Sequence, residues 1–333
     1  MKYREFSDLG WKVSEIGLGC WQIGWCWGEI IKEDDARNIL KEALNNGVNF
    51  FDTSDTYGDG RSERFLSEIL KTSNDIYVTT KLGRRIRGTS YSRGYKHDPM
   101  EEFIDRSLIN LGIEKIDLVQ LHCPPVEICK RFETFDKMDL LVKKGKISHY
   151  GISVYNLSEA YEAIKFKNVK SIQLVFNIFR QKPLDEFFKL AKKNNIAIIA
   201  RGSLGSGLLG GEFNADTKFP ENDHRNYNIK GEAFDIGDTF SGIDFNQGLK
   251  VVEEIKKIIP KNISMSQFAL KWVLMHEEVT VAIPGAINSK QVRTNCTVSE
   301  LESIDEMMPE IRKIYEQYIK DDVSFRLCCF IVF

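Results

Sequence analysis

The sequence has no long hydrophobic run and almost no excess of charge of either sign. None of its apolar stretches is long enough to cross a bilayer, and the first residues, MKYREFSDLGWK, have no apolar core of the signal-peptide type. The 46 basic and 48 acidic residues leave a formal net charge of −2. A chain so close to neutral has no general attraction for nucleic acids or anionic membranes. We therefore expect a cytoplasmic protein that binds neither.

Spacings that build metal sites or disulfide frameworks are absent as well. His122 is followed by Cys123, but no CxxC, HxH or HExxH spacing supplies further ligands, so we expect no metal. The seven cysteines are scattered irregularly along the 333 residues, which indicates a reducing compartment.

The last ten residues differ in character from the rest of the chain. Residues 324–333, SFRLCCFIVF, are abruptly apolar after a charged segment, and they are too few to span a membrane as a helix. We expect residues 1–323 to form one domain and 324–333 to form a tail that packs into a groove on it. A redox-active or lipidated Cys328–Cys329 pair is the alternative.

Eight short apolar runs alternate with segments of helical spacing such as 33–47, 98–112 and 265–278. The runs lie at 15–20, 48–53, 76–81, 116–122, 149–153, 171–176, 196–200 and 279–284. They are nearly continuous in hydrophobicity, as a parallel sheet covered on both faces requires. Eight such strands predict a (β/α)₈ TIM barrel, and their number argues against a doubly wound open sheet. Residues 212–248 are polar and predict a long loop after the seventh strand.

Polar residues end three neighbouring strands, where barrel enzymes carry their chemistry. Asp52 ends the second run, with Tyr57 in the loop after it, while Lys81 and His122 end the third and fourth. A carbonyl group that accepts hydride becomes an alkoxide and needs a proton and a positive field. Tyr57 can donate that proton, and Lys81, held charged by Asp52, can lower the phenol pKa from about 10. His122 can donate a hydrogen bond to the carbonyl oxygen.

At these residues the sequence resembles the aldo-keto reductase family, over nearly its whole length. The matching segments are GVNFFDTSDTYG with RSE close behind, the lysine ending the third strand, DLVQLHCP, GKISHYGISVYN, QLVFN, RGSLGSGLLGG and FALKWVLMHEEVTVAIPGA. The resemblance implies a single barrel domain with its active site at the C-terminal strand ends. It also implies NAD(P)H-dependent reduction of aldehydes or ketones by a tetrad of Asp52, Tyr57, Lys81 and His122, with Tyr57 as general acid.

The resemblance also implies a nicotinamide cofactor bound without a Rossmann domain. Ser153 and Gln173 would hold the nicotinamide amide, and Arg201 would stack on its ring. Backbone N–H groups would surround the pyrophosphate, from Gly202, Ser203, Leu204, Gly205 and Gly207. Gly285, Ala286, Gln291 and Asn295 would contact the adenosine. The G-x-G-x-x-G at 205–210 comes late in the chain and precedes a long polar loop, so it is no Rossmann fingerprint.

Two departures from the family pattern leave the choice between NADPH and NADH open. Relatives carry Lys or Arg just after the IPGA motif to bind the 2′-phosphate of NADPH, and Ile287 and Asn288 stand there in this chain. A lysine near the pyrophosphate is replaced by Glu212. Lys290 and Arg293 are the basic residues that can compensate. NADPH is the expectation from the family.

Aromatic residues after the first strand indicate a wall of the substrate pocket. These are Trp21, Trp25 and Trp27, and the substrate would be a small carbonyl or sugar-like compound. The basic run GRRIRG at 83–88 is expected to be a solvated loop, with attraction of an anionic substrate as the alternative. Two other functions stay open: a cofactor-binding regulatory subunit like the potassium-channel β subunits, and a lyase-type reaction on a sugar.

Overall fold

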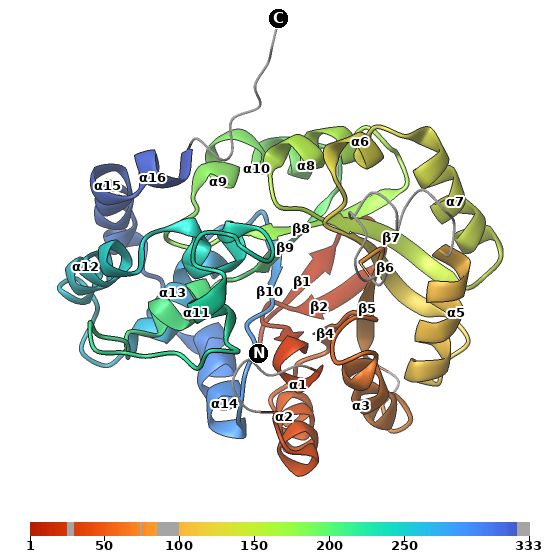
Figure 1. Cartoon of the computed structure of the whole chain (residues 1–333), viewed down its shortest axis with the longest axis horizontal. Coiled ribbons are helices and arrows are strands. Elements are labelled where there is room, and N and C mark those ends of the chain that lie inside the picture. Colours follow the sequence, from red (N-terminus) through yellow and green to blue (C-terminus); the bar gives the residue numbers. More distant parts are fainter. Residues whose placement is uncertain (25–29, 74, 85–99, 325–333) are drawn as a thin grey trace, which may run out of the picture.

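The computed structural model describes residues 1–24, 30–73, 75–84 and 100–324. Within them, eight parallel strands follow one another around a barrel, each paired with the next along the chain (Figure 1). They are β3 (Leu18–Gly19), β4 (Phe50–Asp52), β5 (Tyr77–Leu82), β6 (Ile116–His122), β7 (Ile147–Ser153), β8 (Val169–Val175), β9 (Ala197–Arg201) and β10 (Val279–Ala282). Parallel bridges from Ile16 to Ala282 and from Gly19 to Gly285 join the two ends of the sheet. The predicted barrel and its eight strands are confirmed.

Helices surround the outside of the strands (Figure 1). They include α2 (Glu33–Asn45), α3 (Arg61–Leu70), α5 (Met100–Leu111), α7 (Phe132–Lys143), α8 (Leu157–Ala163), α9 (Lys182–Glu186), α10 (Phe188–Lys193), α12 (Phe245–Lys256), α13 (Met265–Leu274), α14 (Ser289–Thr297) and α15 (Met308–Tyr318). Single turns form α1 (Trp21–Gly24), α6 (Val126–Cys129), α11 (His224–Tyr227) and α16 (Lys320–Ser324). Among the described residues no helix has the length and apolar character needed to span a membrane.

The core between strands and helices is built from large side chains. Trp272 of α13 packs against Phe176, just after β8, with 5.0 Å between ring centroids, and Phe188 of α10 packs on the same ring at 4.7 Å. All three are at most 1% exposed. Burying one such side chain stabilises the fold by about 2–3 kcal/mol, so the apolar faces of these helices keep them against the sheet.

An antiparallel hairpin of β1 (Tyr3–Phe6) and β2 (Trp11–Ser14), which the sequence analysis did not anticipate, closes the N-terminal end of the barrel. Its Phe6 is buried against the inward-facing Phe50 at the start of β4, with 5.6 Å between ring centroids. The barrel interior is therefore filled at this end, and the opposite end carries the polar residues.

The segment predicted to be one long loop, 212–248, has more structure than expected. It contains α11 and two 3₁₀ turns, η2 (Ile236–Asp238) and η3 (Phe240–Gly242), and α12 already begins at Phe245. Another 3₁₀ segment, η1 (Gly205–Gly210), precedes it, and η4 (Val298–Glu300) and η5 (Asp305–Met307) follow α14. Residues 325–333 of the predicted tail lie outside the described residues.

Candidate active site

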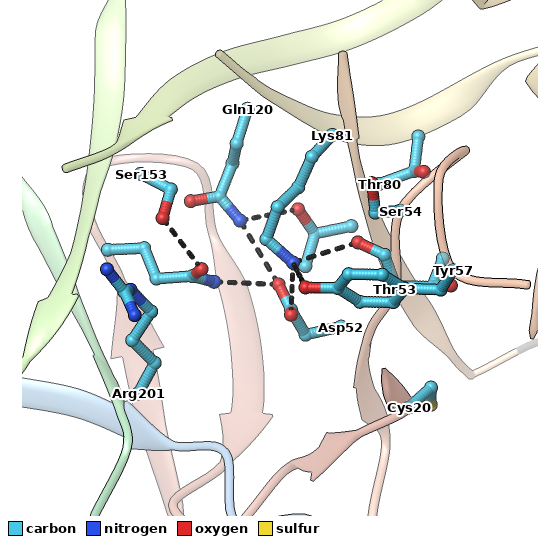
Figure 2. A network of polar contacts seen from close by, with 12 residues as sticks. Cys20, Asp52, Thr53, Ser54, Tyr57, Thr80, Lys81, Gln120, Ser153 and Arg201 are labelled. Atoms are coloured by element: carbon cyan, nitrogen blue, oxygen red, sulfur yellow. Dashed lines mark hydrogen bonds and ion pairs between the residues drawn. The ribbon is translucent and has the colours of Figure 1, made fainter. Parts of the chain in front are cut away.

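Asp52 is the last residue of β4, and its buried carboxylate accepts hydrogen bonds at both oxygens (Figure 2). Oδ1 pairs with the ammonium of Lys81. Oδ2 accepts from Nε2 of Gln173 at 2.7 Å and from Nε2 of Gln120 at 3.2 Å. One positive charge and two amide donors therefore balance a carboxylate that is only 3% exposed.

Lys81 lies on β5, where it is paired with Gln120 of the neighbouring strand. Besides Asp52, its Nζ donates to the carbonyl oxygen of Thr53 at 2.9 Å and to the phenol oxygen of Tyr57 at 3.2 Å. Burial by itself lowers the pKa of this ammonium, but the nearby Asp52 and Tyr57 outweigh burial and raise the pKa above its ordinary value. Lys81 is therefore a buried cation aimed at the phenol.

Tyr57 returns to the rim of the barrel through a loop that packs tightly on α1. A Cβ added at Gly24 would lie 2.6 Å from the carbonyl oxygen of Tyr57, and one at Gly58 would lie 2.0 Å from that of Gly24. Gly58 also has a left-handed backbone, with φ of +60°. Two facing glycines thus permit the backbone contact that places the phenol beside Lys81.

The balance of effects on the Tyr57 hydroxyl differs from the expectation. Burial raises the pKa of Tyr57 above its ordinary value, because the charge of Lys81, which lowers the pKa, is outweighed by burial and Asp52. Lys81 therefore lowers the pKa of Tyr57 as expected, but the net shift is upward because burial and Asp52 outweigh it. Because the phenol stays protonated at neutral pH, it is available as a proton donor.

His122, the last residue of β6, completes this group of side chains. Its ring centroid is 6.1 Å from that of Tyr57 and nearly perpendicular to it, at 83°. Burial and three nearby positive charges, those of Arg84, Lys81 and Arg201, hold the pKa of His122 well below its ordinary value. At neutral pH the ring is therefore an uncharged imidazole.

These side chains line a cavity of about 840 Å³. The predicted residues that line it are Trp21, Asp52, Tyr57, Lys81, His122, Ser153, Gln173, Arg201, Gly202, Ser203, Leu204, Gly205, Gly207, Gly285, Gln291 and Asn295. Ala286 is buried and is not among the lining residues. Trp25, Trp27 and residues 85–88 of the basic run lie outside the described residues, whereas Arg84 lines the cavity.

Ser153 and Gln173 form a chain that ends at the carboxylate. Oγ of Ser153 donates to Oε1 of Gln173 at 3.0 Å, and Nε2 of Gln173 donates to Asp52. The amide of Gln173 is thereby fixed in one orientation. A ligand at this wall of the cavity therefore meets groups that are already ordered by Asp52.

Arg201, at the end of β9, is held by the segment that follows it. Its guanidinium pairs with Asp238 of η2 and donates to the carbonyl oxygen of Val154 at 3.1 Å. Its Cζ lies 5.5 Å from the centroid of the Tyr155 ring. The side chain is only 17% exposed, so Asp238 supplies the negative charge that a buried guanidinium requires.

The turn after Arg201 presents its backbone to the cavity. Gly202, Gly205 and Gly207 have left-handed φ values of +63°, +53° and +92°. A Cβ at Gly207 would lie 3.1 Å from the ring of Phe213 and 3.7 Å from Nη1 of Arg225. Glycine is therefore needed in this turn, where the backbone can approach an anionic ligand closely.

The 212–248 segment supplies part of the cavity wall. Its lining residues are Glu212, Phe213, His224, Arg225, Phe234, Gly237, Asp238 and Ser241. The ring of Trp21 lies 5.8 Å from that of His224 and 6.2 Å from that of Tyr57, between centroids. Burial lowers the pKa of His224 to about 4, so this ring is neutral. Trp21 and His224 thus form a wall next to the phenol.

Residues of α14 also line the cavity. Asn288 accepts a hydrogen bond from the N–H of Gln291 at 2.9 Å and so caps this helix. Lys290 lines the cavity, whereas Arg293 forms an ion pair with Glu42 of α2 at 3.0 Å. Of the two basic residues considered from the sequence, Lys290 is therefore the one that faces the cavity.

Sequence reasoning missed Gln120, Asp238 and Arg225. Gln120 carried a signal, since it is a polar residue inside the otherwise apolar run IDLVQLH. Asp238 and Arg225 carried none, because they stand in a polar segment where nothing distinguishes them from their neighbours. Among the described residues, no cluster of three or more His, Cys, Asp or Glu side chains could hold a metal ion.

Comparison with known proteins shows that the chain matches one protein family over most of its length. The sequence model of the aldo/keto reductase family matches residues 15–316. An uncharacterised oxidoreductase of Bacillus subtilis, YqkF, is 28% identical over 330 residues, covering 97% of this chain and 98% of its own. The structure of a glycerol dehydrogenase of Gluconobacter oxydans superposes with a TM-score of 0.76 at 27% identity, with 96% of each chain covered.

Two further relatives differ from each other in what their names state. The aldo-keto reductase yakc of Schizosaccharomyces pombe, named with NADP(+), is 27% identical over 314 residues, which cover 90% of this chain and 88% of its own. A probable voltage-gated potassium channel subunit β of Arabidopsis thaliana is 24% identical over 342 residues, which cover 96% of this chain and 97% of its own. The similarity therefore extends to proteins of both kinds.

Proposed function

Because the chain belongs to the aldo/keto reductase family, we propose that it is an NAD(P)H-dependent oxidoreductase that reduces aldehydes or ketones to alcohols. The observation that carries this proposal is the hydrogen-bonded series Asp52–Lys81–Tyr57, which ends at a protonated phenol in the cavity. The phenol of Tyr57, the ammonium of Lys81 and the neutral imidazole of His122 line the same cavity, and together they suit the protonation of a carbonyl oxygen.

In the proposed reaction, the nicotinamide supplies the hydride when it is bound. Tyr57 donates its proton to the carbonyl oxygen as negative charge develops there. Lys81, 3.2 Å from the phenol oxygen, stabilises the phenolate that remains. Asp52 keeps Lys81 charged and in position, and His122 contacts the substrate oxygen. In the oxidation of an alcohol, the phenolate of Tyr57 accepts the proton.

The residues along the cavity fit an extended dinucleotide. Gln173 and Arg201, the glycine turn 202–207 and residues between 285 and 295 line the same cavity as the phenol. Backbone N–H groups of a left-handed turn suit a pyrophosphate, and the guanidinium of Arg225 lies beside the turn. We propose that Ser153, Gln173 and Arg201 contact the nicotinamide and that Gly285, Gln291 and Asn295 contact the adenosine.

Lys290 is proposed to recognise the 2′-phosphate of NADPH. Replacing Lys290 with Met should raise the KM for NADPH about tenfold, the equivalent of ~1.4 kcal/mol, and should leave the KM for NADH unchanged. Arg293→Met is the matched control, because its ion pair with Glu42 leaves it no part in the cavity. The measurement is initial-rate kinetics with both cofactors. Equal effects of Lys290→Met on NADPH and NADH would contradict the assignment.

The proposed function is tested by measuring the loss of NAD(P)H absorbance at 340 nm in the presence of an activated aromatic aldehyde. Because a glycerol dehydrogenase is among the structural neighbours, the panel includes glycerol and small sugars in the oxidative direction. Phosphorylated sugars and acidic aldehydes test the alternative of an anionic substrate near Arg84. Turnover of any of these compounds at a steady rate supports an enzyme.

A regulatory subunit is the second candidate, because a relative is named as a probable channel β subunit. Such a protein would quench its tryptophan fluorescence on binding NADPH but would turn over no carbonyl compound. Cofactor binding without turnover across the whole panel would favour this candidate over the enzyme.

A further inference from the structure

The imidazole of His122 makes a contact that the proposed reaction does not use. Its Nδ1 lies 3.3 Å from the hydroxyl oxygen of Ser54, in the loop after β4. The same hydroxyl oxygen lies 3.1 Å from Oδ1 of Asp55. Ser54, Asp55 and His122 are all buried, with Asp55 only 1% exposed. One serine hydroxyl therefore connects the buried carboxyl group of Asp55 to Nδ1 of His122.

Asp55 is surrounded by groups of both signs. The nearby anion is Glu63 of α3. It is fully buried and accepts from Oγ1 of Thr80 at 2.7 Å and from Nδ2 of Asn110 at 2.8 Å. Arg106 of α5 is the nearby cation, and it is paired with Asp59 at 3.0 Å. Burial and the charge of Glu63 raise the pKa of Asp55 to about 7, because Ser54 and Arg106 offset them only in part.

On the His122 side of Ser54, the pKa values of His122, Tyr57 and Lys81 all lie outside the neutral range. His122 faces the positive charges of Lys81, Arg84 and Arg201, and together with burial they keep it neutral around pH 7. The pKa of Tyr57 is raised and that of Lys81 is raised. Asp55 is therefore the group in this network whose proton comes and goes near neutrality.

Below its pKa, Asp55 carries a proton and donates it to the oxygen of Ser54. With Thr56 donating to the same oxygen, the single hydrogen of the Ser54 hydroxyl is left for Nδ1 of His122, which then accepts it. A neutral imidazole that accepts at Nδ1 carries its hydrogen on Nε2. In this state His122 presents a donor to a ligand, as a carbonyl oxygen requires.

Above its pKa, Asp55 is a carboxylate and accepts the hydrogen of Ser54. The oxygen of Ser54 then accepts from Nδ1–H of His122, so Nε2 is left with a lone pair. Thr56, whose Oγ1 is 2.9 Å from the oxygen of Ser54, can donate to it in both states. The network of Asp55, Ser54 and His122 then holds one proton fewer than before, and Nε2 no longer offers a donor to a carbonyl oxygen.

We propose that Ser54 and Asp55 are positioning residues that set the tautomer of His122, so that protonation of Asp55 makes Nε2 a donor and its ionisation makes Nε2 an acceptor. This inference rests on the proposed function only in its consequence. The protonated network offers the reacting oxygen a hydrogen-bond donor from His122, and the ionised network withdraws that donor.

The tautomer is measured directly by two-bond ¹H–¹⁵N correlation spectra of protein labelled at its five histidines. The His122→Gln variant identifies the signals of His122. We expect Nε2–H below about pH 7 and Nδ1–H above it, with the midpoint at the pKa of Asp55. Asp55→Asn and Ser54→Ala should each remove the pH dependence, and Ser54→Thr should retain it. A tautomer that stays the same from pH 5.5 to 8.5 in the parent protein would overturn the proposal.

Kinetics supply the second measurement. In the parent protein, kcat/KM for carbonyl reduction should fall by about tenfold per pH unit above the midpoint, as for one titrating group. Ser54→Ala should abolish that inflection. Ser62→Ala is the matched control, since its hydroxyl bonds Thr53 and the carbonyl oxygen of Cys20 and does not reach His122, so the inflection should persist.

The two measurements separate failure of this inference from failure of the proposed function. If the tautomer changes with pH but no carbonyl compound is turned over, this inference stands and the proposed function fails. If turnover is found and neither the tautomer nor kcat/KM changes near pH 7, this inference is wrong and the proposed function stands.

Discussion

Replacing Tyr57 with Phe is expected to lower kcat for carbonyl reduction by about 10³-fold, within the range for loss of a positioned general acid. The substitution removes only the hydroxyl oxygen, which lies 3.2 Å from Lys81, and leaves the ring that packs near Trp21 and His122. Cofactor binding should persist, because Gln173, the glycine turn and α14 are untouched. Initial rates at 340 nm and fluorescence titration with NADPH measure the two quantities.

The matched control for this substitution is Tyr150→Phe. Tyr150 also has a buried ring with a hydroxyl group that donates to Asp139, at 2.8 Å, but it lies outside the cavity. Loss of the Tyr150 hydroxyl group should lower the free energy of unfolding by about 1 kcal/mol, the usual effect of one hydrogen bond, and should leave kcat unchanged. If Tyr57→Phe retains full turnover, the general acid has been misassigned.

The pH dependence provides a check on the same assignment. Because burial raises the pKa of Tyr57, the phenol stays protonated throughout the neutral range and up to its ordinary value of about 10. Deprotonation of Tyr57 therefore cannot cause a fall in kcat/KM near pH 7. In the Ser54→Ala variant, kcat/KM for reduction should stay level from pH 6 to pH 9.

Replacing Lys81 with Met is expected to damage both stability and activity. Asp52 would keep its hydrogen bonds from Gln120 and Gln173 but would lose the cation that balances its buried charge. Removal of one partner of a buried ion pair costs about 3–5 kcal/mol, and the phenolate formed in reduction would lose its stabilising charge. The free energy of unfolding in urea and kcat measure the two losses.

A second substitution separates these losses. In the Lys81→Met background, Asp52→Asn removes the uncompensated charge, while the amide oxygen can still accept from Gln120 and Gln173. Stability should recover by about 2 kcal/mol or more, because an unpaired buried charge is what destabilises the single variant. Activity should not recover, because the ammonium beside Tyr57 is still missing. Recovery of kcat in the double variant would show that Lys81 acts only by supporting the fold.

The eight strands were predictable from the sequence because hydrophobicity is a local property. Each predicted run overlaps one strand of the barrel, and the fold class follows from their number and from the helical segments between them. The hairpin of β1 and β2 was not predicted. Each of its strands has only four residues, and what stabilises them is Phe50 and other inward-facing residues of distant strands.

The placement of Asp52, Lys81 and His122 at one rim was also predictable, because strand ends of a parallel barrel meet at the same face. Their hydrogen-bond partners were not. Asp52 receives its second and third hydrogen bonds from Gln120 and Gln173, which are 68 and 121 residues away in the chain. Such contacts depend on the register of β6 and β8 against β4, which no local pattern encodes.

The sequence by itself therefore determined the barrel, the end of it that carries chemistry, and which side chains reach that end. Only the tertiary structure decided which charges balance one another. It pairs Arg201 with Asp238, turns Arg293 toward Glu42 and leaves Lys290 at the cavity, and connects Asp55 to His122 through Ser54. The physical reason is that periodicity acts between neighbours in the chain, whereas burial and electrostatics act between neighbours in space.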